Sequence, residues 1–205
     1  MPFYAILIIK KVMKGRKIMS KNNIFPIIVE IPKGSGHKYE YDLKTGRIVL
    51  DRVLYGANFY PGEYGFIENT LDWDGDPLDV ISLSTYPTIP GCQINVRILG
   101  TINMIDNGEI DTKLMAVMAD NPRFNHIQTL EDVPLAIRNE IETFFLQYKT
   151  LEKKEVKING WSGLDQALKE IKECQERYLE YKDILETKGK DAVMKIWKEK
   201  GLGKI

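Results

Sequence analysis

The sequence is poor in cysteine and histidine and carries no net charge. Its 205 residues include only Cys92, Cys174, His37 and His126 from those two classes, too few for a disulfide framework, a zinc site or a histidine-rich metal centre. The 29 basic and 29 acidic residues cancel, so no overall electric field favours binding to nucleic acid or to a membrane surface. These absences predict a protein of the reducing cytoplasm.

The sequence also lacks a hydrophobic run long enough to cross a membrane. The apolar stretch 3–9 falls short of the roughly 20 residues that a spanning helix needs. Basic residues follow this stretch, whereas the basic region of a signal peptide precedes its apolar part. We therefore predict that residues 1–18 are an upstream extension, disordered or non-native, and that Met19 is the functional start. The alternative is that the apolar stretch forms an edge strand.

What the sequence does have is a dense acidic run. Asp74, Asp76 and Asp79 lie within the six residues DGDPLD, where a glycine lets the backbone turn and a proline fixes one backbone dihedral angle. Carboxylates this close repel one another and stay ionised only when cations lie between them. The run predicts a stiff loop that binds hard divalent cations such as Mg²⁺ or Mn²⁺. We expect the neighbouring Asp72 to be an ordinary solvated residue.

Residues 24–119 have the pattern of short β-strands separated by turns. β-Branched and aromatic residues recur in six predicted strands, at 27–31, 38–42, 47–53, 80–83, 94–102 and 113–119. Residues 43–46 (LKTG) suit a hairpin connection with a glycine at its end. Because no helical pattern separates these strands, we predict a small closed barrel.

The hydrophobic period becomes helical in the second half of the chain. We expect Asp132 to cap a helix that begins near Pro134. Ser162 and Asp165 match the capping-box pattern at the start of a second helix. Gly189 is expected to end that helix, and a short third helix follows. The predicted fold class is α+β, with a mainly β core followed by two to three C-terminal helices.

Residues that suit phosphate chemistry are spread along the predicted strands and the first helix. They are Glu30, Lys38, Glu40, Arg52, Tyr60, Tyr64, Asp106, Asp111, Lys113, Tyr148 and Lys149. Residues two apart on a strand face the same side, so Lys38 and Glu40 are expected to lie together. One barrel mouth could gather the whole set, with carboxylates around metals and the other groups around an anion. Taken singly, Lys38 and Arg52 could be solvated strand residues, and Tyr148 could serve packing.

In order and spacing, these residues resemble the motifs of the family I soluble inorganic pyrophosphatases. The resemblance runs from about residue 24 to residue 177, through EIP (30–32), KYE (38–40), DR (51–52), YPGEYG (60–65), DGDPLDV (74–80), D…DTK (106–113), FFLQYK (144–149) and GW (160–161). It implies a five-stranded closed barrel of the oligonucleotide/oligosaccharide-binding (OB) type with flanking helices. It also implies a cytoplasmic enzyme and, as in prokaryotic members, a homohexamer.

The resemblance also assigns roles to single residues. Metal binding, to roughly three or four Mg²⁺ ions, falls to Asp74, Asp79, Asp111, Asp106 and Glu30. Contacts with phosphate oxygens fall to Lys38, Arg52, Tyr64, Lys113, Tyr148 and Lys149. Asp76 would accept a proton from the attacking water, and Glu40 and Tyr60 would order the surrounding groups. The implied reaction is Mg²⁺-dependent hydrolysis of inorganic diphosphate to two orthophosphates by direct in-line attack of a metal-activated water, and Mn²⁺ or other divalent ions could substitute.

Three other functions fit the sequence less well. A calcium-binding EF-hand that begins at Asp72 would need its glycine later than Gly75 and a glutamate in place of Leu83. An OB-type barrel could bind single-stranded nucleic acid, but a mouth crowded with aspartates repels phosphate backbones. A nucleotide hydrolase would be expected to carry a glycine-rich Walker loop, and the sequence contains none.

We predict three segments along the chain. Residues 1–18 are the upstream extension, residues 19–177 form the catalytic domain, and residues 178–205 form a helical C-terminal extension. The lysines and glutamates of the last segment favour a solvated amphipathic helix that caps the subunit. An additional contact between subunits around Val193, Ile196 and Trp197 is the alternative.

Overall fold

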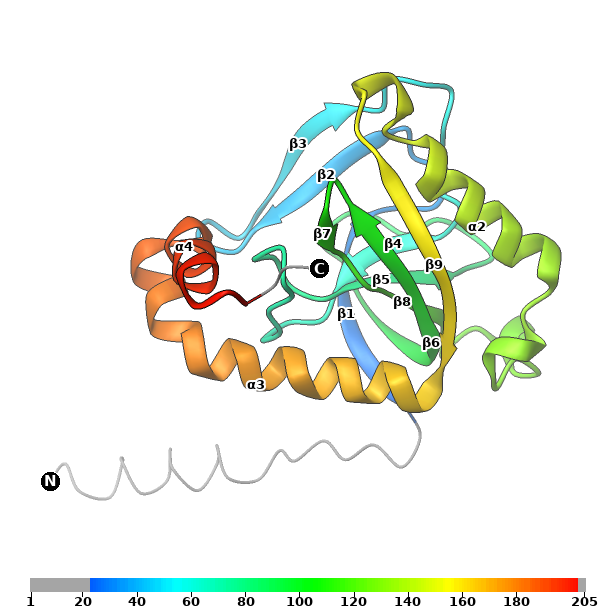
Figure 1. Ribbon diagram of the computed structural model, residues 1–205. Helices are drawn as coiled ribbons and strands as arrows, with labels where there is room; N and C mark the ends of the chain where they lie inside the picture. Colours follow the sequence, from blue (N-terminus) through cyan, green and yellow to red (C-terminus); the bar gives the residue numbers. More distant parts are fainter. Residues whose placement is uncertain (1–22, 203–205) are drawn as a thin grey trace, which may run out of the picture.

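The computed structural model describes residues 23–202 and has an α+β architecture, as predicted (Figure 1). One sheet contains β1 (Ile24–Ile31), β4 (Glu63–Phe66), β5 (Asp79–Leu83), β6 (Gln93–Asp106), β7 (Glu109–Ile110), β8 (Lys113–Met118) and β9 (Val156–Gly163). A separate hairpin is formed by β2 (His37–Asp42) and β3 (Arg47–Val53). The helices are α2 (Leu135–Gln147), α3 (Leu164–Lys188) and α4 (Lys190–Lys200), with 3₁₀ turns at Pro122–Phe124, Leu130–Asp132 and Thr150–Glu152.

The strand pairings form a circuit. β1 pairs with β4, β4 with β5, β5 with β8 and β8 with β6, and β6 also pairs with β1. All of these pairs are antiparallel except β5 with β8. β9 adds to β6, where a side chain on Gly100 would lie 2.2 Å from the Ser162 carbonyl oxygen. Glycine is therefore required where these two backbones meet.

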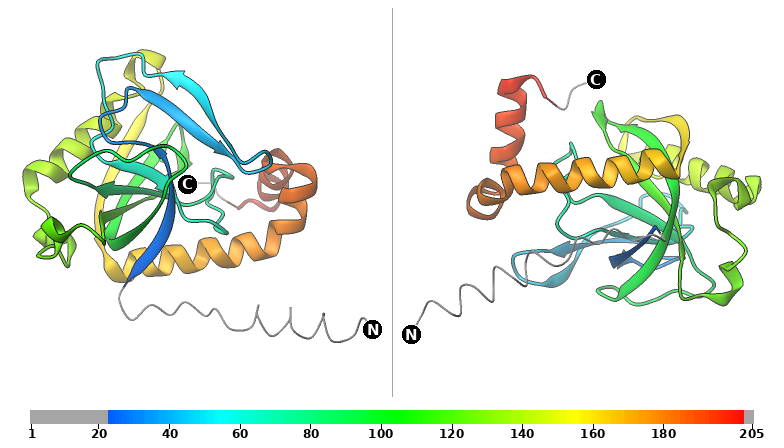
Figure 2. Two further views of the ribbon diagram at one scale, coloured as in Figure 1. Left: turned by 180° about the vertical axis from the view of Figure 1, so that it is seen from behind. Right: turned by 90° about the horizontal axis from the view of Figure 1, so that it is seen from below.

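Three apolar clusters hold the helices in place. α2 packs Phe144 and Phe145 into a core that includes Ile81 and Met115 of the sheet. α3 lies along another side of the sheet, where Ile171 joins a second cluster (Figure 2). α4 leaves the end of α3 in a new direction and shares a third cluster with α3 and the loop before β5. The loop that carries the acidic run is thus packed between the sheet and the two C-terminal helices.

The predicted strands are confirmed to within a few residues, apart from the longer β6, but three strands were missed: β4, the two-residue β7, and β9. β4 has the sequence EYGF and is too short and glycine-rich to show a strand pattern. β9 contains Gly160 with a φ of +94°, which breaks the alternation of side chains. A prediction from local pattern alone has no access to the pairing with β6 that holds β9 in place.

Both predicted helix caps are wrong. Asp132 accepts hydrogen bonds from the backbone amides of Gln128 and Thr129, 2.9 and 2.8 Å away, within a 3₁₀ turn that precedes α2. Ser162 lies in β9, and its hydroxyl accepts a hydrogen bond from Asn103. α3 instead begins after Gly163 without a side-chain cap. Capping patterns also suit turns and strand ends: Asp132 serves a local turn, whereas pairing with β6 places Ser162 in a strand.

The predicted division of the chain into three segments stays a prediction. The proposed extension at residues 1–18 lies outside the described residues. The predicted domain boundary at residue 177 falls inside α3, which continues without a break to Lys188. Within residues 23–202, no helix has the length and apolar character needed to span a membrane.

Candidate active site

The acidic run forms a tight loop before β5. Gly75 has a φ of +85°, a conformation that side chains other than glycine rarely adopt. The Asp72 amide donates to the Asp76 carbonyl oxygen at 2.7 Å, and the Gly75 amide donates to the Asp72 carbonyl oxygen at 3.0 Å. The Asp76 amide also donates to Asp74 Oδ1 at 3.0 Å. These hydrogen bonds hold the loop backbone and thereby orient the side chains of Asp74 and Asp76.

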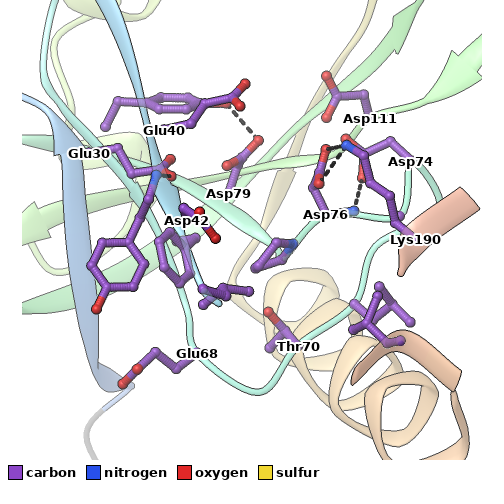
Figure 3. A pocket seen from close by; sticks show the side chains of 18 of the residues that line it. Glu30, Glu40, Asp42, Glu68, Thr70, Asp74, Asp76, Asp79, Asp111 and Lys190 are labelled. Carbon is purple, nitrogen blue, oxygen red and sulfur yellow. Dashed lines mark hydrogen bonds and ion pairs between the residues drawn. The ribbon is translucent and has the colours of Figure 1, made fainter. Parts of the chain in front are cut away.

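This loop borders a cleft of about 1010 Å³, which we call the main cleft (Figure 3). The predicted site residues that line it are Glu30, Lys38, Glu40, Tyr64, Asp74, Asp76, Asp79, Asp106, Asp111, Lys113, Tyr148 and Lys149. They come from six strands (β1, β2, β4, β5, β6 and β8), the acidic loop and the segments after β7 and α2. A smaller side cleft of about 260 Å³ shares Asp74, Asp76, Asp106, Asp111 and Lys149 with it.

Lys113 is buried between two of the carboxylates. Its ammonium group donates to Asp79 Oδ2 at 2.5 Å and to Asp111 Oδ1. Burial opposes its positive charge, but the carboxylates of Asp111 and Asp79 outweigh burial and hold the pKa of Lys113 well above its usual value. The Tyr64 hydroxyl donates to the same Asp79 oxygen at 2.6 Å. The carboxylates at the floor of the cleft are therefore compensated by a fixed cation and a phenol.

Asp106 pairs with a second basic residue of the cleft, Lys149. Lys149 donates to Asp106 Oδ2, and the Tyr148 hydroxyl lies 3.5 Å from the same oxygen. The second oxygen, Oδ1, is buried and has no hydrogen-bond partner among residues 23–202. A buried carboxylate oxygen without a donor is costly, and a bound cation would remove that cost.

The hairpin contributes the opposite wall of the cleft. Lys38 Nζ lies 2.5 Å from Glu40 Oε1 and 3.3 Å from Asp51 Oδ2, which confirms that Lys38 and Glu40 share one face of β2. Glu30 on β1 accepts a hydrogen bond of 2.7 Å from the Tyr41 backbone amide. The hairpin thus places Lys38 and Glu40 in the main cleft, and Glu30 of β1 lines the cleft with them.

Two predicted residues, Arg52 and Tyr60, do not line either cleft. Arg52 pairs with Asp51 at 2.5 Å and with Glu152 at 2.9 Å, and its buried Nη2 has no partner within the described part of the chain. Tyr60 is 2 % exposed, and its ring centroid lies 5.3 Å from that of Tyr64. Tyr60 supports Tyr64 from behind, whereas Arg52 retains a donor for a further ligand.

The donor set of the main cleft suits hard divalent cations. Burial, reinforced by the negative charge of Asp111, raises the pKa of Asp74 well above its usual value. Burial also raises the pKa of Asp111, although Lys113 opposes the shift. Carboxylates whose ionised form is this unfavourable without a metal ion are stabilised when a cation binds them. Together with the unpaired oxygen of Asp106, they fit the predicted metal site.

Asp72 is not the solvated residue that the sequence predicts. It is 2 % exposed, and burial raises its pKa to about 7. Arg177 of α3 donates to the Leu71 carbonyl oxygen at 2.7 Å and lies 3.4 Å from Asp72 Oδ1. Asp72, Glu170 and Cys174 also bring their ligand atoms within 4.8 Å of one another. Because the guanidinium group already supplies a cation there, we interpret this cluster as the anchor between the loop and α3.

Lys190 is a charged residue of the site that sequence reasoning missed. Lys190, the first residue of α4, lines both clefts and pairs with both carboxylate oxygens of Asp76, at 2.8 and 2.7 Å. The two residues are 114 positions apart in the sequence. No local pattern connects them, and only the packing of α4 on the loop brings them together.

Glu30 provides a pH test of the cleft in the absence of metal. Burial, with a contribution from the Asp79 carboxylate, raises the pKa of Glu30 from 4.5 to about 8. Between these values the folded protein holds a proton that the unfolded chain has lost, so this group lowers the free energy of unfolding as the pH rises. We expect Glu30→Gln to reduce the loss of stability between about pH 5 and pH 8.

This prediction is checked by urea unfolding in excess chelator at several pH values. Glu68→Gln is the matched control, because Glu68 is exposed at the edge of the same cleft. Asp74 and Asp111 leave a residual slope in every variant, since their pKa values are also raised. Equal slopes for the wild-type protein and Glu30→Gln would show that Glu30 is ionised in the folded state.

Comparisons with known proteins agree with one another. The family model for inorganic pyrophosphatase matches residues 27–179. The chain is 48 % identical over 162 residues to inorganic pyrophosphatase from Geobacillus stearothermophilus, covering 79 % of this chain and 98 % of that protein. The crystal structure of inorganic pyrophosphatase from Thermus thermophilus superposes with a TM-score of 0.74 at 47 % identity, covering 78 % of this chain and 93 % of that chain. The structure from Helicobacter pylori gives a TM-score of 0.76 at 34 % identity, covering 80 % and 99 %. The chain therefore belongs to the family I inorganic pyrophosphatases and is a hydrolase.

Proposed function

We propose that the protein hydrolyses inorganic diphosphate to two orthophosphates with Mg²⁺ as cofactor, by direct in-line attack of water. The observation that carries this proposal is the composition of the main cleft. Its lining includes the carboxylates of Glu30, Asp74, Asp76, Asp79, Asp106 and Asp111 together with the ammonium groups of Lys38, Lys113, Lys149 and Lys190. A site with both charges in such numbers suits a highly anionic substrate that is bound together with cations.

Five carboxylates that line the main cleft are the proposed metal ligands. They are Asp74, Asp79, Asp111, Asp106 and Glu30. When bound, Mg²⁺ supplies positive charge against the phosphate oxygens and lowers the pKa of a coordinated water. Lys113 and Lys149 now pair with Asp79, Asp111 and Asp106, so their ammonium groups are already positioned beside the proposed ligands.

The basic residues and phenols are the proposed contacts of the phosphate oxygens. Lys38, Arg52, Tyr64, Lys113, Tyr148 and Lys149 are the members of this set. The unpaired Nη2 of Arg52 gives this role specific support, because a buried guanidinium N–H without an acceptor favours an anionic ligand. Glu40 and Asp51 orient Lys38 from the hairpin side. Tyr60 packs behind Tyr64 and is proposed to hold its ring in place.

Asp76 is the proposed proton acceptor. Its side chain is half-exposed, whereas Asp74 beside it is more deeply placed in the loop. A general base must reach the proton of the attacking water without being committed as a metal ligand, and the half-exposed Asp76, which is not among the proposed ligands, is the candidate for that role. Leaving-group charge would then develop on the side of Lys38, Arg52 and Lys149, and no phosphoenzyme is required.

The finer points of architecture and assembly are part of the same proposal. We interpret the circuit of pairings among β1, β4, β5, β8 and β6 as a five-stranded OB-type barrel. We propose that the protein acts as a cytoplasmic homohexamer, with the catalytic unit at residues 19–177 and a helical extension after it. Size-exclusion chromatography with light scattering would measure the assembly.

The reaction is tested by phosphate release from diphosphate, with ATP as a parallel substrate. We expect fast release from diphosphate in Mg²⁺, little release from ATP, and a fall of more than about 100-fold in excess chelator. Phosphate release with Mn²⁺ in place of Mg²⁺ would show whether another divalent cation supports the reaction. Release from neither substrate by folded protein would contradict the proposal, and titration with a single-stranded oligonucleotide in the absence of metal would then follow.

A further inference from the structure

Helix α4 lies outside the residues that the family model matches, yet it packs directly on the acidic loop. The match ends at residue 179, and α4 begins at Lys190. Val193 and Trp197 are buried in a cluster with Leu71, the residue that opens the loop. The Trp197 ring also meets that of Trp73 edge-on, with centroids 5.2 Å apart. A buried apolar anchor of this kind holds the helix at a defined place beside the site.

The first turn of α4 touches the acidic run itself. A side chain on Gly75 would lie 3.3 Å from Lys190 Cβ and 3.3 Å from Met194 Cγ. Gly189, which has a φ of +80°, separates α3 from α4 and allows this change of direction. The first turn of α4 therefore lies so close to the acidic loop that a side chain at position 75 would crowd it.

The Lys190 side chain extends from this turn to Asp76 (Figure 3). Its ammonium group lies 2.8 and 2.7 Å from the two carboxylate oxygens, and the two side chains are 51 % and 50 % exposed. Lys190 also lines both clefts together with Asp74 and Asp111. The ammonium group is thus a positive charge that the fold places among the carboxylates of the proposed metal site.

A fixed positive charge at this place has two opposite electrostatic effects. It stabilises the crowded carboxylates of the loop when no metal is present, and it repels a divalent cation that binds beside it. Because the pair is half-exposed, water and salt screen both effects and limit their size. The same charge attracts a polyanionic substrate, since both belong to one cleft.

We propose that Lys190 is a further functional residue of this site, a tethered cation on α4 that sets the affinity for the divalent metal. Its ammonium group pairs with the Asp76 carboxylate, and its positive charge opposes binding of the metal at Asp74 and Asp111. This role rests on the proposed function, because it concerns the metal ions of that reaction. Removal of the charge should therefore tighten metal binding, whereas loss of a merely structural contact would loosen the loop and weaken it.

The test is titration of the full chain with Mg²⁺ by isothermal calorimetry, without substrate. We expect Lys190→Met to bind Mg²⁺ about threefold to tenfold more tightly than the wild-type protein. Lys190→Arg keeps the charge and should restore the wild-type affinity. Lys195→Met is the matched control, because Lys195 is exposed on the same helix and lines neither cleft. Circular dichroism of each variant verifies that α4 is folded.

Each other outcome overturns the role of Lys190. Unchanged or weaker Mg²⁺ binding by Lys190→Met would show that its charge does not oppose the metal. An equal gain in Lys195→Met would assign the effect to the general charge of the surface. No Mg²⁺ binding by the wild-type protein would overturn the proposed function as well, whereas normal binding and hydrolysis with no effect of Lys190→Met would overturn the inference alone.

Discussion

Asp76→Asn is expected to lower the turnover number for diphosphate by about 10²–10⁴-fold at saturating Mg²⁺, the range that general base catalysis contributes. Asparagine has nearly the same shape as aspartate, but its amide does not accept a proton from water at neutral pH. The Asp76 amide and carbonyl groups, which bond to Asp74 and Asp72, are unchanged by this substitution. The loop should therefore keep its conformation while it loses the proposed proton acceptor.

The measurement is steady-state phosphate release, with Mg²⁺ affinity and thermal unfolding determined on the same samples. Asp165→Asn is the control for the chemical change, because Asp165 is exposed on α3 and lines neither cleft. Asp76→Glu keeps a carboxylate one methylene further along and should recover part of the activity. If Asp76→Asn retained full turnover, Asp76 would not be the acceptor, and the proton would have to leave the water by another route.

The main features of the fold follow from local pattern, and the errors follow from its limits. The strands at 47–53 and 80–83 were predicted to within one residue, because β-branched and apolar residues recur there between clear turns. β9 was missed because its stability comes from pairing with β6 rather than from its own residues. The same limit explains the wrong caps at Asp132 and Ser162, since a capping pattern does not state which element it serves.

The site was predictable wherever one short motif fixes several residues. The spacing of Asp74, Asp76 and Asp79 with a glycine between them implies a loop, and the structure has that loop. Asp72 could not be distinguished from its neighbours, because the partner that buries it, Arg177, lies 105 residues away in the sequence. Lys190 was equally hidden. Charge pairs between distant segments leave no local signature, so they are found only in three dimensions.

Lys113→Met is expected to have the largest effect on stability in the absence of metal. The Lys113 side chain is 4 % exposed and lies between Asp79 and Asp111, whose carboxylates it compensates. Removal of one partner from a buried ion pair costs about 3–5 kcal/mol, because the remaining charges stay buried without compensation. For a chain of this length, that cost corresponds to a fall in Tm of roughly 6–20 °C in excess chelator.

Added Mg²⁺ should then raise the Tm of Lys113→Met more than that of the wild-type protein, because a bound cation takes over the compensation of Asp79 and Asp111. Lys157→Met is the matched control, since Lys157 pairs with Glu155 on the surface, where both side chains are more than half exposed. Surface pairs contribute little, so this control should change Tm only slightly. Equal changes in the two variants would mean that the cleft carboxylates are neutral without metal. A large loss that Mg²⁺ does not reverse would mean that Lys113 holds the fold rather than the charge balance of the site.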